Sequence, residues 1–299
     1  MRSVLAQQDV VAEVLVINDG GDSATAALIE EFADARVRLL VNTGAPGVSG
    51  ARNTGIAAAT GDWVAFLDDD DLWAPGKLAA QLAVAEAAGA GWVYAGDVTV
   101  DAALRVRGGC PPPPPEEIVQ RLRAYNAVPA GASNVAVRRE VLAVTGGFDP
   151  GLRTSEDWDL WLRLAATGLP AYVPRPLVAL RTHPAMASRA VKRMLADIEI
   201  IADRHGIAVD RPRHQRWAAW ICLEDGNQRT ALRHYAHAVA EGDLMSLGRA
   251  AVALVAPGLA RRRRPDPADR WVRQAQTWLD ALRDEAASAA HREGGRSAL

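Results

Sequence analysis

The sequence predicts an α/β protein whose sheet is mostly parallel, followed by a helical C-terminal region. In the N-terminal part, short apolar runs alternate with segments of helical spacing, an order typical of parallel strands joined by helices. From about residue 190 onward the chain is rich in Ala and Arg and has little strand character. We therefore divide it into an α/β domain, residues 1–189, and a helical region, residues 190–299.

The individual elements follow from runs of apolar residues and from Gly and Pro punctuation. A hairpin is expected near residues 97–107, and a stiff polyproline spacer at residues 111–115. Strands are predicted at residues 13–18, 37–41, 63–67 and 92–94, and helices at 24–33, 48–59, 77–88, 116–124 and 155–168. Residues 132–149 predict a further strand, a short helix and a Gly-Gly turn, and another strand is expected just before "RTHP".

Composition limits the classes of function. The chain has 299 residues, 49% hydrophobic and 23% charged, which fits one large or two modest globular domains and argues against disorder. With 34 basic and 36 acidic residues, the charge balance requires neither a nucleic acid nor an anionic membrane as partner. Cys110 and Cys222 lie far apart without metal-ligand spacing, which favours a reducing, cytoplasmic setting. No signal peptide or confident membrane span is evident in the sequence.

Four consecutive carboxylates, Asp68, Asp69, Asp70 and Asp71, follow the apolar run "WVAFL". Such like charges repel one another unless a cation lies among them, and alternate residues of a strand end point the same way, which groups Asp68 with Asp70. Mg²⁺ and Mn²⁺ take oxygen ligands and usually keep water and phosphate oxygens as well. By itself the run also fits a solvated acidic turn before the helix that starts near Pro75.

Two other segments offer ligand-binding groups at the ends of predicted elements. Asp19 in "VINDGG" ends a strand, where its carboxylate can accept a hydrogen bond from a nucleotide base; alone, the segment is also an ordinary Asp-Gly turn. In "GVSGARNTGI", Ser49, Arg52 and Asn53 stand near a helix start, where N–H groups and a guanidinium can meet phosphate. A helix cap packed closely through glycine explains that segment equally well.

The stretch "TSEDWDLWLR" contains a candidate general base. Glu156 and Asp157 stand at a predicted helix start, with Ser155 before them as a candidate cap. Acidic residues also suit this position because of the helix dipole alone. Arg181 and His183 in "RTHP" follow a predicted strand and are weaker candidates.

These pieces occur in one order along the chain: an Asp-Gly turn, "GARNTGI", "FLDDDD", "GGFD" and "SEDWDLWLR". Together they resemble the family 2 glycosyltransferases, which have a Rossmann-like GT-A fold and transfer a sugar from a nucleotide diphosphate to an acceptor with inversion. The resemblance covers about residues 2–189. It implies a metal-dependent inverting glycosyltransferase, with cell-wall or polysaccharide biosynthesis as the expected role.

The resemblance also implies roles for particular residues. The first acidic turn would contact the nucleotide base, the Asp-X-Asp motif would hold the ribose and a divalent ion bridging the diphosphate, and the Glu-Asp pair would supply the base. The catalytic residues implied are Asp157, as the base, and Glu156; the residues implied to bind the nucleotide sugar are Asp19, Arg52, Asn53, Asp68 and Asp69; those implied to bind Mg²⁺ or Mn²⁺ are Asp68 and Asp70.

The chain departs from the family pattern in three ways, one of which is that the tail after Arg189 matches no motif of the family. Family members usually read Asp-Asp-Gly-Ser where this chain has "NDGG" at residues 18–21. They also begin with a strand and a Pro-Thr-Tyr-like loop, whereas this chain begins within the helix that follows, at "RSVLAQQ". We therefore expect the true start to lie upstream. The alternatives are an N-terminally truncated, inactive relative that acts only as a binding module, and a nucleotidyltransferase, which would need a Gly-rich basic phosphate loop that the N-terminus lacks.

The expected partners are a nucleotide-diphosphate sugar and a saccharide, lipid-linked or other hydroxyl acceptor, with no nucleic acid. Residues 243–264 join a mildly apolar helix to four arginines, a combination that could rest on the inner face of an anionic membrane. The favoured interpretation is a helix packed against its neighbours, with a solvated basic end.

Overall fold

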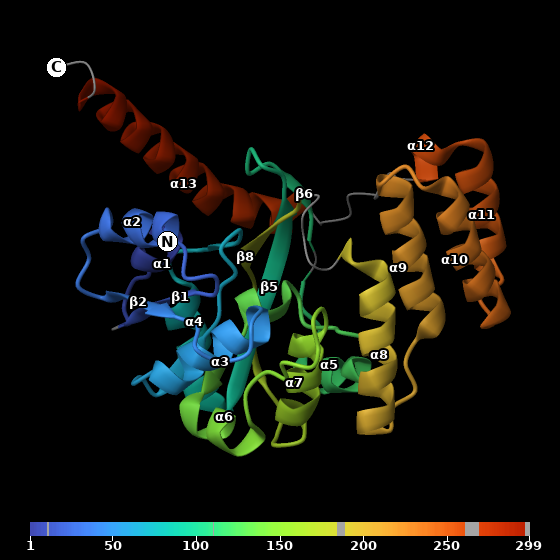
Figure 1. The fold of residues 1–299 in the computed structure, drawn as a ribbon, viewed down its shortest axis with the longest axis horizontal. Coiled ribbons are helices and arrows are strands. Elements are labelled where there is room, and N and C mark those ends of the chain that lie inside the picture. The colour runs from blue at the N-terminus through green and yellow to red at the C-terminus, as the bar shows by residue number, and fades with distance from the viewer. Residues whose placement is uncertain (11, 110, 184–188, 261–268, 297–299) are drawn as a thin grey trace.

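The structure, a computed structural model, describes residues 1–10, 12–109, 111–183, 189–260 and 269–296. It confirms the α/β class: helices flank a central sheet, and a layer of helices lies on one side of the molecule (Figure 1). In the described residues no helix combines the length and hydrophobicity needed to cross a membrane.

The strands form two sheets. The first two strands pair in parallel, and the other six form a mixed sheet in the order β3-β7-β5-β8-β4, with β6 paired to β5. In this larger sheet β5 and β8 are parallel to each other, and the other pairs are antiparallel. The strands are β1 (Val14–Asn18), β2 (Val37–Val41), β3 (Trp63–Ala65), β4 (Leu72–Trp73), β5 (Trp92–Val100), β6 (Val106–Gly108), β7 (Ala136–Arg138) and β8 (Ala171–Arg181).

The helices follow the predicted order with small shifts at their ends. They are α1 (Arg2–Leu5), α2 (Ser23–Glu30), α3 (Val48–Ala58), α4 (Lys77–Ala88), α5 (Pro115–Leu122), α6 (Arg139–Thr145), α7 (Glu156–Ala165), α8 (Val191–His205), α9 (Arg211–Glu224), α10 (Gln228–Ala240), α11 (Met245–Val255), α12 (Pro257–Ala260) and α13 (Asp269–Arg296), with a short 3₁₀ turn, η1 (Gly131–Asn134).

Strand β5 is the centre of the large sheet and is longer than the sequence predicted. The expected strand ended at Tyr94, because Gly96 and Asp97 interrupt the apolar run. In the structure β5 continues to Val100, since β8 pairs with it from Val93 onward and satisfies its backbone groups. Pairing with a distant strand therefore outweighs the local sequence signal.

The main hydrophobic core joins this sheet to helices α7 and α8. The rings of Trp92 and Trp161 stack with their centroids 6.4 Å apart, and both side chains are fully buried. Helix α8 adds Ile198 and Ile201 to the same cluster. The first helix after residue 189 thus shares the core of the α/β part, and the division at residue 189 stays a prediction about the sequence.

The last helix also packs on the sheet. Trp271 of α13 donates a hydrogen bond from Nε1 to the Asp97 carbonyl oxygen at 2.9 Å. A Cβ atom on Gly96 would lie only 2.2 Å from the Trp271 ring, so this close approach requires glycine. Cys110 and Arg261–Arg264 lie outside the described residues.

One carboxyl of the acidic turn is buried and anchors the turn to the sheet. Asp71 is 4% exposed, and its Oδ1 accepts a hydrogen bond from the Arg181 backbone N–H at 3.0 Å. Burial raises the pKa of Asp71 to about 7; the charges of Asp68 and Asp70 add to the rise, and hydrogen bonds from Ser133 and Arg181 oppose it. Asp71 is therefore a structural carboxyl rather than a ligand group.

The pKa of Asp71 predicts how stability depends on pH. Between pH about 4 and about 7 the unfolded chain releases a proton that the folded protein keeps, so the free energy of unfolding falls as pH rises across this window. The shift from 3.8 to about 7 sets an upper limit of about 4 kcal/mol. Asp71→Asn should make this dependence shallower in urea titrations across the window; part of the slope remains, because the pKa of Asp157 is also raised to about 7.

Asp203→Asn, on the exposed surface of α8, is the matched control and should leave the dependence as it is in the unmodified chain. An equally steep pH dependence in Asp71→Asn would show that another group carries it.

Candidate active site

Arg52 of helix α3 connects the acidic turn after β3 with the start of helix α7. Its Nη2 donates to Asp68 Oδ1 at 2.6 Å, and its Nη1 donates to Glu156 Oε1 at 2.7 Å. The Arg52 side chain is only 12% exposed, and its guanidinium lies 5.0 Å from the centroid of the Phe148 ring. Both hydrogen bonds are charge-assisted, so they are stronger than neutral ones and fix the relative position of the two acidic segments.

The loop before α3 places Arg52 at this point. Gly47, the residue before the helix, donates its backbone N–H to Asp19 Oδ2 at 2.9 Å, and Asn42 donates Nδ2 to Asp19 Oδ1 at 2.5 Å. A Cβ atom on Gly50 would lie 1.7 Å from the Ala45 carbonyl oxygen, so the first turn of α3 can pack here only with glycine. Asp19 thus braces the start of α3 and remains exposed.

The acidic turn leaves three carboxylates facing outward. The side chains of Asp68 and Asp70 are 42% and 31% exposed, and Asp69 is exposed. His183 contacts Asp70, with Nε2 and Oδ2 2.7 Å apart. Two residues that are 113 positions apart in the sequence are therefore brought together, whereas Arg181 reaches the turn through its backbone N–H to Asp71.

Asp157 at the start of α7 has the properties of a general base. Its Oδ2 accepts a hydrogen bond from Asn126 Nδ2 at 3.0 Å, and its Oδ1 accepts one from the Trp158 backbone N–H at 2.7 Å. Burial raises the pKa of Asp157 to about 7, the negative charge of Glu156 raises it further, and Arg52 opposes the rise. This carboxyl is accordingly poised to exchange a proton near neutral pH.

The predicted cap of this helix is only half correct. Ser155 does occupy the position before α7, but its side chain makes no capping hydrogen bond. The backbone at Ser155, with φ −141° and ψ 25°, lies outside the extended conformation usual for a capping residue.

A segment that the sequence analysis overlooked lies directly against Asp157. A Cβ atom on Gly131, whose φ is +51°, would lie 2.7 Å from Asp157 Oδ2. Next to it, the Ser133 hydroxyl accepts a hydrogen bond from the Asp68 backbone N–H at 3.1 Å. Buried Asn134 exchanges two hydrogen bonds with the Ala95 backbone, at 2.6 and 2.8 Å, and so fixes the segment to β5.

The polar pair Ser-Asn inside the apolar run "ASNVAV" is a signal that could have identified this segment. Asn126 stands in a loop between α5 and η1, and nothing in its sequence neighbourhood singles it out.

Asn53 is occupied by the "GGFD" loop. Its Nδ2 donates to the Phe148 carbonyl oxygen at 2.7 Å, and its Oδ1 accepts the Phe148 N–H at 2.8 Å. A Cβ atom on Gly147 would lie 2.1 Å from Asn53 Oδ1, which explains the glycine. In this structure Asn53 therefore holds Phe148 beneath the Arg52 guanidinium.

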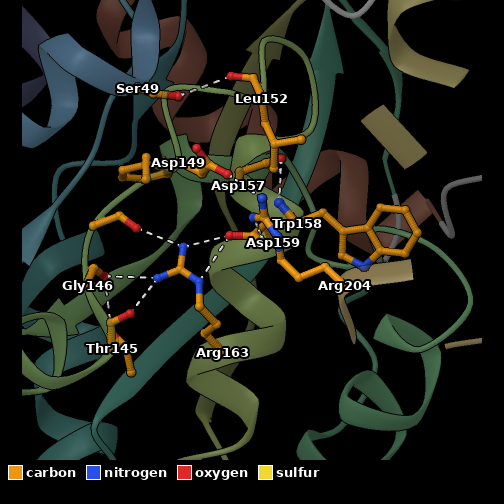
Figure 2. A network of polar contacts seen from close by, with 12 residues as sticks. Ser49, Thr145, Gly146, Asp149, Leu152, Asp157, Trp158, Asp159, Arg163 and Arg204 are labelled. Atoms are coloured by element: carbon orange, nitrogen blue, oxygen red, sulfur yellow. Dashed lines mark hydrogen bonds and ion pairs between the residues drawn. The ribbon is translucent and has the colours of Figure 1, made fainter. Parts of the chain in front are cut away.

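A second ionic network holds α7 from its other side (Figure 2). The buried carboxylate of Asp159 contacts Arg163 at 2.8 Å, Arg204 at 2.9 Å and His205 at 2.8 Å. Burial favours the neutral acid, but the hydrogen bond from His205 and the neighbouring arginines outweigh it and lower the pKa of Asp159. The carboxylate thus stays charged and ties α7 to α8.

Arg163 extends this network to the "GGFD" loop. It donates from Nη1 to the Thr145 carbonyl oxygen at 2.6 Å and from Nη2 to that of Gly147 at 2.8 Å (Figure 2). Arg204 reaches Asp149 of the same loop at 2.6 Å. The loop that positions Phe148 is therefore anchored from below by α7 and α8.

Comparisons with known proteins bear on the family and the fold of this chain. Residues 1–146 match the profile of the family described as Glycosyl transferase family 2. The chain is 46% identical over 90 residues to the succinoglycan biosynthesis protein ExoO of Rhizobium meliloti, covering 30% of this chain and 26% of that one. It is 42% identical over 84 residues to the Escherichia coli UDP-Glc:alpha-D-GlcNAc-diphosphoundecaprenol beta-1,3-glucosyltransferase WfgD, covering 28% and 33%.

A longer match reaches TuaG of Bacillus subtilis, a putative teichuronic acid biosynthesis glycosyltransferase, with 28% identity over 179 residues, 58% of this chain and 68% of that one. The chain thus spans about a quarter to a third of ExoO and WfgD and two thirds of TuaG.

Among solved structures, the mannosyltransferase PcManGT from Pyrobaculum calidifontis, in complex with GDP-Man and Mn²⁺, aligns over 94% of this chain and 79% of its own with a TM-score of 0.50 and 20% identity. At this identity the likeness speaks for the fold, which is the predicted GT-A fold. Residues 1–146, the matched part of the chain, belong to family 2 of the glycosyltransferases.

Proposed function

We propose that this glycosyltransferase moves a sugar from a nucleotide-diphosphate donor to an acceptor hydroxyl with inversion, and that Asp157 is the base. One observation carries the proposal. The Arg52 guanidinium holds Asp68 of the acidic turn on one side and Glu156 on the other, and Glu156 is the immediate neighbour of Asp157. The proposed donor-binding turn at Asp68 and the proposed base, Asp157, are thereby kept at a fixed distance from each other.

The base step follows from the environment of Asp157. Near neutral pH a carboxyl with a pKa of about 7 can take the proton of the acceptor hydroxyl as that oxygen attacks the anomeric carbon. The hydrogen bonds from Asn126 and the Trp158 N–H orient the carboxylate. The bond from the anomeric carbon to the nucleotide diphosphate breaks on the opposite face of the sugar, which inverts the configuration.

The acidic turn fits a hard divalent cation. Asp68 and Asp70 offer oxygen donors at the rim of the sheet, where each uses one oxygen for Arg52 or His183. Within the described residues no cluster of three or more metal-binding side chains occurs. Mg²⁺ is usually bound by one or two carboxylates together with water and substrate phosphate oxygens. We propose that Asp68 and Asp70 hold Mg²⁺ or Mn²⁺; when bound, the ion would neutralise charge on the departing diphosphate.

The remaining contacts to the nucleotide sugar are proposed from the positions of the residues alone. Asp19 is exposed at the end of β1 and can accept from a base N–H, and exposed Asp69 can reach the ribose. Arg52 uses one N–H of each Nη atom for Asp68 and Glu156, and its other N–H groups can donate to a phosphate oxygen. The mannosyltransferase from Pyrobaculum calidifontis was solved with GDP-Man and Mn²⁺, which supports this class of donor.

The names of the relatives suggest the acceptor class. ExoO and TuaG belong to polysaccharide and teichuronic acid biosynthesis, and WfgD acts on a lipid-linked GlcNAc. We propose a saccharide acceptor in cell-wall or polysaccharide biosynthesis, and a reaction on the cytoplasmic side, in line with the separated cysteines.

The first prediction concerns the base. Asp157→Asn should spare donor binding and lower turnover by at least about 100-fold, because the amide cannot accept the acceptor proton. Turnover is measured as nucleotide diphosphate released from a panel of nucleotide sugars with Mn²⁺ and acceptor. Before mutation, kcat should rise with pH through about 7, since only the ionised carboxyl is active.

Asp62→Asn is the control, since Asp62 is exposed at the opposite end of β3. Turnover of Asp157→Asn equal to that of the control would exclude Asp157 as the base.

The second prediction concerns the metal site. Asp70→Asn should weaken Mn²⁺-dependent donor binding by at least about tenfold, corresponding to about 1.4 kcal/mol, because one of two charged ligands is lost. Calorimetric titration with donor, with and without Mn²⁺, measures this effect. Asp157→Asn serves as the comparison and should bind as the unmodified protein does; donor affinity in Asp70→Asn that still responds fully to Mn²⁺ would exclude the site.

A further inference from the structure

Helices α11 and α12 expose a continuous apolar face to solvent. The large side chains on this face, with their exposed fractions, are Leu244 (69%), Met245 (73%), Leu247 (58%), Val252 (40%), Leu254 (61%), Val255 (84%) and Leu259 (59%). We call these seven residues the apolar face. Single exposed hydrophobic residues are common on protein surfaces, but a contiguous set on one helix marks an interaction site.

The polarity of α11 is the reverse of that of an ordinary surface helix. Between residues 244 and 260 the sequence contains one charged residue, Arg249, and one other polar side chain, Ser246. Ser246 is buried and donates to Asp243 Oδ2 at 2.7 Å. The positions turned inward are small, including fully buried Ala253. A surface helix normally turns its large apolar residues inward and its polar residues outward.

The helix nevertheless has a fixed position. It packs against α10, and Gln228 of that helix donates from Nε2 to the carbonyl oxygens of Ala253 and Leu254 at 2.8 and 3.0 Å. In Figure 1, α11 lies on the outer side of the layer formed with α9 and α10, away from the sheet. The helix is therefore packed as the sequence analysis expected, but its large side chains point away from the protein.

We propose that the apolar face lies on an anionic lipid bilayer and holds this glycosyltransferase at a membrane surface. Helix α11 has 11 residues, too short to cross a bilayer, whereas burial of one apolar face at the interface requires no spanning length. Arg249, 48% exposed, stands at the edge of the face, 3.6 Å from Asp243.

The charge next to the apolar face favours an anionic bilayer, rather than a second copy of the chain, as the partner that covers this face. In the sequence, four consecutive arginines, residues 261–264, follow directly after Ala260 of α12. A second copy of the chain carries the same run of positive charge and therefore offers no complementary charge to this segment. The headgroups of an anionic bilayer attract them instead, and this attraction adds to the burial of apolar surface. The inference is independent of the reaction proposed above.

The test uses the full chain and flotation with phosphatidylcholine vesicles, with or without phosphatidylglycerol. The protein should float with the phosphatidylglycerol vesicles, bind phosphatidylcholine alone at least about tenfold more weakly, and lose binding as salt is raised. The double variant Met245→Glu/Val255→Asp should bind the anionic vesicles at least about tenfold more weakly, because two charges would have to enter the interface.

The control is Leu28→Glu/Val144→Asp, which introduces the same two charges at apolar side chains that are 56% and 85% exposed on α2 and α6. It should float as the unmodified chain does. Melting temperature and nucleotide diphosphate release without vesicles should be the same in both double variants. Equal vesicle binding by the two double variants, no binding by the unmodified chain, or a dimer dissociated by Met245→Glu/Val255→Asp in the absence of vesicle binding would each overturn the proposal.

Discussion

The geometry of this site depends on a buried guanidinium placed between two carboxylates from distant segments. Removing the charges of Arg52 and Glu156 from water costs several kcal/mol per ion, and only good geometry offsets this cost. Two hydrogen bonds of 2.6 and 2.7 Å and the face of the Phe148 ring supply that geometry. If Arg52 were removed, two carboxylates would face each other without a counter-charge, so the guanidinium positions the rim of the sheet and the start of α7 as one unit.

A largely apolar scaffold with a few satisfied polar groups supports this unit from behind. Lys77 is fully buried; its Nζ donates to Gln81 at 2.7 Å and lies 4.1 Å from the centroid of the Trp73 ring, while burial lowers its pKa. Gln81 in turn donates to the Asn134 carbonyl oxygen, and Trp73 donates to that of Ser133. Helix α4, strand β4 and the turn beside Asp157 are thereby fixed to one another, which keeps an exposed acidic turn in a defined position.

Two carboxyls on helix α7, those of Asp157 and Asp159, differ in pKa because their surroundings differ. Asp157 and Asp159 are two residues apart on α7 and therefore lie on different faces of it. Burial and the neighbouring Glu156 raise the pKa of Asp157 to about 7. The pKa of Asp159 is lowered, although burial opposes this, because His205, Arg163 and Arg204 surround it. One carboxyl is thus available for proton transfer, and the other is a permanent ionic anchor.

Most of the local structure follows from the amino-acid sequence, including the strand at residues 37–41 and the helix at 77–88, as do the positions of the acidic turn and the Glu-Asp pair. These features depend on residues that are only a few positions apart. The periodic spacing of apolar residues and the positions of Gly and Pro therefore indicate them directly. Contacts in the folded chain determine three further features: Asp71 points inward, Asn53 braces the Phe148 backbone, and α11 turns its large side chains outward. Such roles depend on contacts between distant positions: Arg52 and Glu156 are 104 residues apart, and no local pattern encodes their meeting.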